Sequence, residues 1–314
     1  MNSSLYSKQG LIRIMLARRL FGLARGDRLP IIAELTEEFD CSRGLVQNAI
    51  AMLEETGAIV LNKRGSLGTF LVSTDYSKLW RETAWESIVG CSPLPYTKRH
   101  EGLATGIYSL MDKMGIPFRF AYMQGAETRA QAIMSGKFHF ATMSKVAAQI
   151  ICDREPSLHI LMSLPPLSYL GGYAMAYRDK AWKEKKVLKV GIDSNSPDHA
   201  LMIRSRFGAK YEAKTGQKVE FVPLPYTRMI EAMHSGLIDI TIYNKDGLEL
   251  GFVQAGAYVS DISLTDSEKD GTCAVILVSN EDYGLAPLLK DVLIMEKLLK
   301  TQNEVMEGKR TPIY

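Results

Sequence analysis

Residues 27–72 read DRLPIIAELTEEFDCSRGLVQNAIAMLEETGAIVLNKRGSLGTFLV, and this stretch decides the fold of the first part of the chain. Pro30 suits the start of a helix, where the N–H that proline lacks has no partner in any case. Apolar residues then recur at helical spacing as far as Phe39. Ser42 suits the N-cap of a second helix, and Gly57 suits its end. Two short strands are predicted next, at residues 58–62 and 69–73, joined by a glycine-bearing turn.

The second predicted helix has an apolar face and a polar face. The apolar face repeats from Val46 to Leu53, and the opposite face carries Arg43, Gln47 and Asn48. Arg, Gln and Asn side chains make bidentate contacts to base edges in the major groove of DNA. A polar stripe is also typical of the solvated face of any helical bundle. The ordered set of helix, turn, capped helix, glycine stop and hairpin favours a winged helix-turn-helix that binds double-stranded DNA.

The residues predicted to contact DNA lie on the second helix and at the hairpin, called the wing, whose basic tip can reach backbone phosphate. They are Ser42, Arg43, Gly44, Gln47, Asn48, Lys63, Arg64, Gly65, Ser66, Gly68 and Thr69. Net charge does not itself argue for nucleic acid, because the whole chain carries only +3. Residues 1–75 hold nine Lys or Arg against eight Asp or Glu. The prediction therefore depends on where the charges lie.

The same stretch resembles the winged-helix domain of GntR-type bacterial regulators. The matching residues are Leu29, Pro30, Glu34, Leu35, Ser42, Arg43, Gly44, Val46, Ala49, Leu53, Glu54, Gly57, Gly68, Thr69 and Phe70. Ala33 and Gln47 stand where that family usually has arginines that touch DNA, so the resemblance does not imply the usual operator. Across nearly its full length the chain resembles the YhfZ family of bacterial transcription regulators. That resemblance implies a winged helix joined to a domain like a periplasmic binding protein, and it names no ligand.

Composition limits the other possibilities. The 314 residues are enough for two or three compact units of ordinary globular composition. Four scattered cysteines lack metal-ligand spacing, which favours reduced thiols in the cytoplasm, although an oxidising compartment would allow disulfides. Residues 156–177 lack charged residues and are long enough to cross a membrane. They contain prolines and paired glycines, so buried strands and a crossover are predicted, with no membrane segment.

Beyond residue 87 the pattern changes to alternating strands and helices, which predicts an α/β fold. A helix that ends in Ser-Gly and leads into a buried strand occurs at residues 132–140 and again, 100 residues later, at 232–240. Two such lobes look like a type II periplasmic-binding-protein fold. The predicted domains are 1–75 for the winged helix, 76–87 for a linker or short helix, and 88–314 for the two lobes. Lobe I takes 88–180 plus 265–314, and lobe II takes 187–264.

Three longer helices are predicted from apolar periodicity. The first covers residues 5–23, where it packs on the helix-turn-helix or makes a dimer contact. A single helix is predicted at 199–215, and a closing amphipathic helix at 287–307.

A ligand is predicted between the lobes, beyond the carboxyl ends of the strands, where helix N-termini offer free N–H groups. Polar residues follow several strands there, and Pro-Leu-Pro-Tyr-Thr occurs twice, at 93–97 and 223–227. The predicted ligand-binding residues are Ser92, Tyr96, Thr97, Gln124, Ser144, Ser194, Asn195, Ser196, Tyr226, Tyr243 and Asn244. Helix capping or plain packing would equally explain these side chains.

No catalytic residue, metal site or cofactor is predicted. The five histidines make no H-E-x-x-H, and G-x-S-x-G, P-loop and GxGxxG motifs are lacking. The sequence therefore predicts a cytoplasmic, homodimeric transcription regulator that binds an operator and a small organic effector, for which an anionic molecule is one candidate. The alternatives are an enzyme acting on a small metabolite in the second domain, and a second domain that only oligomerises.

Overall fold

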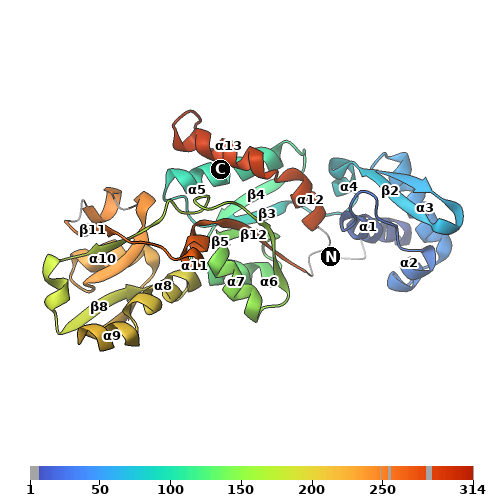
Figure 1. Ribbon diagram of the computed structural model, residues 1–314. Coiled ribbons are helices and arrows are strands. Elements are labelled where there is room, and N and C mark those ends of the chain that lie inside the picture. Colours follow the sequence, from blue (N-terminus) through green and yellow to red (C-terminus); the bar gives the residue numbers. More distant parts are fainter. Residues whose placement is uncertain (1–6, 248, 254–255, 281–284, 314) are drawn as a thin grey trace. The chain divides into compact units, whose positions relative to one another are not determined.

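The computed structural model describes residues 7–313 apart from 248, 254–255 and 281–284 (Figure 1). The described residues divide into two compact units. One comprises Met1–Val89, Tyr108–Arg119 and Glu281–Ile294, and the other Gly90–Ile107, Phe120–Asn280 and Met295–Tyr314. Because this division follows contacts rather than chain order, the boundaries predicted at residues 75 and 87 stay predictions.

The first unit contains the predicted helix-turn-helix and wing. Its elements are α1 (Lys8–Phe21), α2 (Ile32–Glu38), α3 (Arg43–Glu55), β1 (Ile59–Lys63), β2 (Thr69–Thr74), α4 (Tyr76–Arg81) and α12 (Leu285–Val292). Helix α3 packs against α1 and α2, and β1 pairs with β2 in an antiparallel hairpin. The core of this unit includes Leu16, Leu35, Val46 and Leu53, all of which are fully buried. The order of elements predicted from the sequence is thus confirmed.

Several local details in this unit differ from the prediction. Pro30 precedes α2 instead of beginning it, because Ile31 is still extended and serves as the N-cap. The Glu34 carboxylate accepts the Ile31 N–H at 3.0 Å and so satisfies one free donor of the helix start. Ser42 is the N-cap of α3, but its side chain makes no capping bond. Residues 5 and 6 of the expected first helix lie outside the described residues.

Residues 76–81, predicted as linker or short helix, form α4. The Asp75 carboxylate caps this helix by accepting the Lys78 N–H at 3.0 Å. Trp80 is 3% exposed, and its ring centroid lies 5.9 Å from that of Phe21 and 5.2 Å from that of Trp85. This segment therefore packs on α1 through an aromatic cluster, within the first unit.

The first of two five-stranded sheets has the strand order β4-β3-β5-β12-β6. These strands are β3 (Ile88–Ser92), β4 (Phe118–Tyr122), β5 (Phe140–Ser144), β6 (Leu158–Ser163) and β12 (Ala274–Ser279). Helices α6 (Ala126–Met134) and α7 (Lys145–Arg154) bury their alanine and isoleucine side chains on one face of this sheet. Helix α5 (Lys98–Asp112) packs through Gly102 and Gly106 against α13 (Met295–Met306). Strand β12 is antiparallel to its neighbours, as expected of a chain that returns to the first lobe.

The second sheet has the order β11-β7-β10-β8-β9. Its strands are β7 (Tyr173–Tyr177), β8 (Val187–Ile192), β9 (Lys218–Pro223), β10 (Ile240–Asn244) and β11 (Tyr258–Asp261). Its helices are α8 (Pro197–Phe207), α9 (Ala209–Thr215) and α10 (Met229–His234), and the short helix α11 (Asp266–Lys269) follows β11 in the chain. Residues 173–177 were predicted in lobe I. They belong to lobe II instead, because β7 pairs along its whole length with β10 and β11.

The repeat seen in the sequence is a repeat of structure. Helix α6 ends at Met134 and α10 at His234, and the strands that follow begin at Phe140 and Ile240, again 100 residues apart. Gly136 and Gly236 have φ angles of +69° and +77°, the left-handed conformation that commonly ends a helix. The two α/β lobes predicted from this pattern are confirmed.

Two predicted long helices are each divided. Helix 199–215 is interrupted at Gly208, where a Cβ atom would lie 2.4 Å from the Arg204 carbonyl oxygen. Helix 287–307 is interrupted between Val292 and Met295. The charge-free run 156–177 forms β6 and β7, and none of the helices in the described residues is long and apolar enough to cross a membrane.

Candidate functional site

The polar face of α3 is open to solvent. All five residues predicted to contact DNA from this helix and its cap are exposed, namely Ser42, Arg43, Gly44, Gln47 and Asn48. The apolar residues Val46, Ala49 and Leu53 of the same helix are fully buried. The structure thus buries the apolar face of α3 and leaves the face that carries Arg43, Gln47 and Asn48 exposed to solvent, as the sequence predicted.

The wing carries the remaining predicted DNA contacts. Lys63, Arg64, Gly65 and Ser66 are exposed, whereas Gly68 and Thr69 are half-buried. The Lys63 ammonium pairs with the Glu54 carboxylate at 2.9 Å, and the Arg64 guanidinium lies 4.9 Å from the centre of the Phe70 ring. Arg28, which was not predicted, lies close to Gly68 and adds a third basic group beside the hairpin. DNA contact by these residues stays a prediction.

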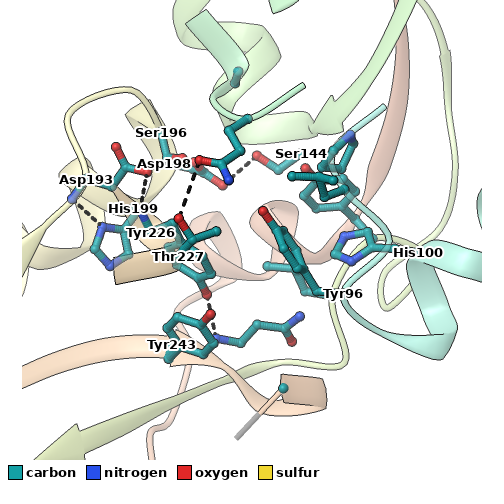
Figure 2. Close-up of a pocket in the computed structure, with 18 of the residues that line it drawn as sticks. Tyr96, His100, Ser144, Asp193, Ser196, Asp198, His199, Tyr226, Thr227 and Tyr243 are labelled. Carbon is teal, nitrogen blue, oxygen red and sulfur yellow. Dashed lines mark hydrogen bonds between the residues drawn. The ribbon is translucent and has the colours of Figure 1, made fainter. Parts of the chain in front are cut away.

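The second unit holds a cavity of about 270 Å³ that is lined by both lobes (Figure 2). Eight residues predicted to bind a ligand line it: Tyr96, Thr97, Gln124, Ser144, Ser196, Tyr226, Tyr243 and Asn244. Three predicted residues do not. The Ser92 side chain is buried, and its hydroxyl bonds to that of Thr142 at 2.8 Å. Ser194 and Asn195 are exposed in the loop that precedes α8, because Asp193 and Ser196 take the positions that face the cavity.

Both copies of Pro-Leu-Pro-Tyr-Thr contribute to the cavity wall. Tyr96 and Tyr226, one from each copy, line it together (Figure 2). Tyr226 stacks on Tyr243 with ring centroids 4.2 Å apart, and its hydroxyl accepts the Asn244 N–H at 2.7 Å. Burial raises the pKa of Tyr226 well above its ordinary value and raises that of Tyr243 to about 12. Both tyrosine side chains are therefore uncharged, and they line the cavity with aromatic rings that carry a polar hydroxyl at one edge.

Two titratable side chains of the second lobe, His199 and Asp193, form hydrogen bonds with backbone groups. His199 Nδ1 accepts the Asp193 N–H at 3.1 Å, and with that tautomer Nε2 donates to the Ile242 carbonyl at 3.0 Å. Burial lowers the pKa of His199, so the ring is neutral. The Asp193 carboxylate accepts from the Asn195 N–H, the Ser196 hydroxyl and the Tyr226 N–H at 2.9, 3.3 and 3.0 Å. Neither group is placed as a free acid or base, so a binding role suits them better than catalysis.

Two polar groups of the first lobe, which were not predicted, line the cavity from the first turns of helices α5 and α6. His100 Nδ1 bonds to the Thr97 hydroxyl at 3.2 Å, and burial lowers the pKa of the ring to about 4. Arg129 donates from Nε to the Thr142 carbonyl at 3.1 Å and from Nη1 to the Met123 carbonyl at 2.8 Å. Both lie in the first turn of their helix, α5 or α6, where the sequence does not show which helical face meets the cavity.

The two lobes contact each other around the cavity. The Ser144 hydroxyl donates to the Asp198 carboxylate at 2.7 Å, and the Thr227 hydroxyl donates to the Gln124 side-chain oxygen at 3.4 Å (Figure 2). Nearby, Arg99 pairs with Asp246 at 2.8 Å. These bonds join side chains of opposite lobes, so they depend on the lobes staying closed. Within the described residues, no three His, Cys, Asp or Glu side chains are grouped to hold a metal ion.

The structure consists of a winged helix-turn-helix joined to a two-lobed α/β body. This combination places the chain in the class of proteins that fuse a helix-turn-helix domain to a domain of periplasmic-binding-protein fold. Comparisons with known proteins agree: the family described as YhfZ C-terminal domain matches residues 75–314, and a helix-turn-helix domain matches residues 24–71. The chain belongs to the YhfZ family.

Three similar proteins illustrate the range. The uncharacterized protein YhfZ of Escherichia coli K12 is 32% identical over 314 residues, which is 100% of both chains. The crystal structure of YhfZ from Shigella flexneri is 30% identical with a TM-score of 0.62, covering 76% of this chain and 98% of that chain. A periplasmic binding protein from Salmonella typhimurium is 14% identical with a TM-score of 0.52, covering 71% of this chain and 99% of that one, and shows the fold alone.

Proposed function

We propose that this protein is a cytoplasmic transcription regulator that binds DNA through α3 and the wing and responds to a small molecule in the cleft. The observation that carries the proposal is the exposed face of α3, on which Arg43, Gln47 and Asn48 lie together while the apolar face is buried. These three side-chain types make the bidentate contacts that distinguish bases in the major groove. The basic groups of the wing would then contact phosphate.

The chain would act as a homodimer, in the manner of GntR-type regulators. Two copies of α3 would lie about one helical turn of DNA apart, about 34–36 Å, and would read a nearly palindromic operator. The cleft supplies the control, because an effector that closes the lobes shifts the protein between two states that differ in affinity for DNA. Eight cavity-lining residues predicted from the sequence support this second half of the proposal.

Selection of bound fragments from a genomic library tests the DNA half. The full-length protein should retain a small set of fragments that share one inverted repeat, and electrophoretic shift should then give an affinity about 10³-fold or more above that for unrelated DNA at the same salt concentration. Retention of fragments without any common sequence would overturn the proposal.

Replacing Gly125 by alanine should weaken the response to the effector. Gly125 has a φ of +79°, and a Cβ atom there would lie 3.1 Å from the Cβ of Asn195 in the opposite lobe. Gly136→Ala is the matched control, since its φ is +69° and nothing lies within 4 Å of its Cβ position. Both changes should cost about 1–2 kcal/mol of stability through the left-handed backbone. Only Gly125→Ala should also shift the effector dose–response of operator release, and equal shifts for both variants would contradict closure at this contact.

A further inference from the structure

Arg129 is a buried cation that lacks an acidic partner. It is 3% exposed, and no carboxylate among the described residues comes within 4.0 Å of its guanidinium. Two of its nitrogens donate to the carbonyls of Met123 and Thr142. A guanidinium has five N–H donors, so capacity remains. An unpaired buried charge is unfavourable unless something compensates for it, and Arg129 lines the cavity, where an anion can do so.

His100 adds an independent sign of a ligand on the same wall. The residue is 6% exposed and lines the cavity, and its Nε2 is buried with no hydrogen-bond partner in the described part of the chain. Buried polar atoms nearly always have a partner. Gly125 and Ala126, at the N-terminal end of α6, line the cavity beside these two groups. The remaining N–H donors of Arg129, the unpartnered Nε2 of His100 and the N-terminal end of α6 together suit a planar carboxylate.

The opposite wall has the opposite charge. Asp198, in the first turn of α8, accepts only the Ser144 hydroxyl and has no Lys, Arg or His in ion-pair distance among the described residues. Asp193, also on this wall, is 5% exposed. A second negative charge on the ligand would face these two carboxylates. A protonated amine would instead pair with Asp198 and lie near the faces of neutral tyrosines.

We propose that the cleft binds an amino acid, with the ligand carboxylate on Arg129 and its protonated amine on Asp198. This inference rests on the proposed function, because it names the effector class of the same cleft. The cavity of about 270 Å³ is slightly smaller than the usual range for small-molecule sites, about 300–1,000 Å³, and so suits a single amino acid rather than a peptide.

The test uses the full-length protein and matched probes. The common L-amino acids are screened by thermal shift at millimolar concentration, together with succinate and inorganic phosphate. We expect at least one amino acid to raise the melting temperature. In titration calorimetry, the amine that lacks its carboxylate and the acid that lacks its amine should each bind at least about tenfold more weakly. Binding of succinate or phosphate with no amino acid bound, or no shift with any probe, would overturn the inference.

Two variants locate the charges. Arg129→Gln should weaken amino-acid binding by about 30-fold or more, because it removes the partner of a buried carboxylate. Since Arg129 also holds two backbone carbonyls, Asp198→Asn provides a second test at a half-buried position: amino-acid affinity should fall about tenfold while binding of the amine-free acid improves. Asp266→Asn, on exposed α11, is the matched control and should change neither. Unchanged affinity in well-folded Asp198→Asn protein would contradict the assignment.

Operator binding, measured by electrophoretic shift on the same samples, keeps the two proposals apart. If no amino acid binds but the specific operator complex forms, the amino-acid proposal is wrong and the proposed regulator function is retained. If an amino acid binds but no specific DNA complex forms, the proposed ligand class is supported and the proposed regulator function is contradicted.

Discussion

Replacing Arg43, Gln47 and Asn48 together by alanine should abolish specific operator binding. Each bidentate base contact contributes about 1–3 kcal/mol of discrimination, so three lost contacts should weaken the complex roughly a thousandfold or more. Arg43→Ala alone should cost about 1–3 kcal/mol. The folded state should hardly change, because all three side chains are exposed on α3. Electrophoretic titration of the selected operator at fixed salt measures the effect.

Lys214→Ala is the matched control for the loss of positive charge. Lys214 is an exposed residue of α9, and its removal changes net charge by the same amount as Arg43→Ala. Its operator affinity should equal that of the unaltered protein. If the triple variant binds the operator as tightly as this control does, α3 is not the recognition helix.

Of the substitutions proposed for this protein, Asp239→Ala should cause the largest decrease in the free energy of unfolding. Asp239 is 5% exposed, and its carboxylate pairs with the Lys185 ammonium and accepts the Lys189 N–H at 3.0 Å. Its backbone N–H donates to the Lys189 carbonyl at 2.8 Å, which places the side chain between β8 and the start of β10. Removing one partner of a buried pair typically costs about 3–5 kcal/mol. Thermal unfolding of the full chain should show a fall in Tm of roughly 10 °C.

The same group gives a direction for the pH dependence. Burial opposes ionisation of Asp239, but hydrogen bonds from Lys185 and from the Lys189 N–H outweigh it and hold the pKa below the ordinary value of 3.8. A carboxylate whose pKa is lower in the folded state stabilises the fold above the unfolded pKa, and this stabilisation is lost as the pH falls through the folded pKa. The difference in Tm between Asp239→Ala and the unaltered protein should therefore shrink below about pH 4.

Asp266→Ala serves as the control for this prediction. Asp266 also pairs with a lysine, Lys269, at 2.8 Å, but its side chain is 97% exposed, so its removal should leave the Tm unchanged. Equal losses for the two variants would show that the buried position of Asp239 does not matter.

Much of the architecture could be read from local patterns. The apolar and polar faces of α3, the left-handed Gly57 after its C-terminal end, and the wing follow from spacing and turn chemistry that involve near neighbours in the chain. The two lobes followed from one repeated unit, in which Ser-Gly ends a helix ahead of a buried strand. Element ends were less predictable. Gly208 and residues 293–294 interrupt helices because packing, rather than periodicity, decides where the chain turns.

The cleft was predictable only in part, for a geometrical reason. Polar residues that directly follow strands, such as Ser144 and Asn244, could be placed because strand ends share one edge of a sheet. Arg129 and His100 lie in the first turns of helices, and a sequence does not show which helical face meets a cavity. Strand β7 was placed in the wrong lobe because pairing partners in a sheet are distant along the chain.

The amino-acid sequence by itself determined the order of the elements, the exposed polar face of α3 and the doubling of the α/β unit, since these depend on residues within a few turns or strands of each other. Only the tertiary structure decided which charges meet at the cleft. Arg129 and Asp198 are 69 positions apart, and their place on opposite walls of one cavity comes from the packing of two lobes, which leaves no trace in local spacing.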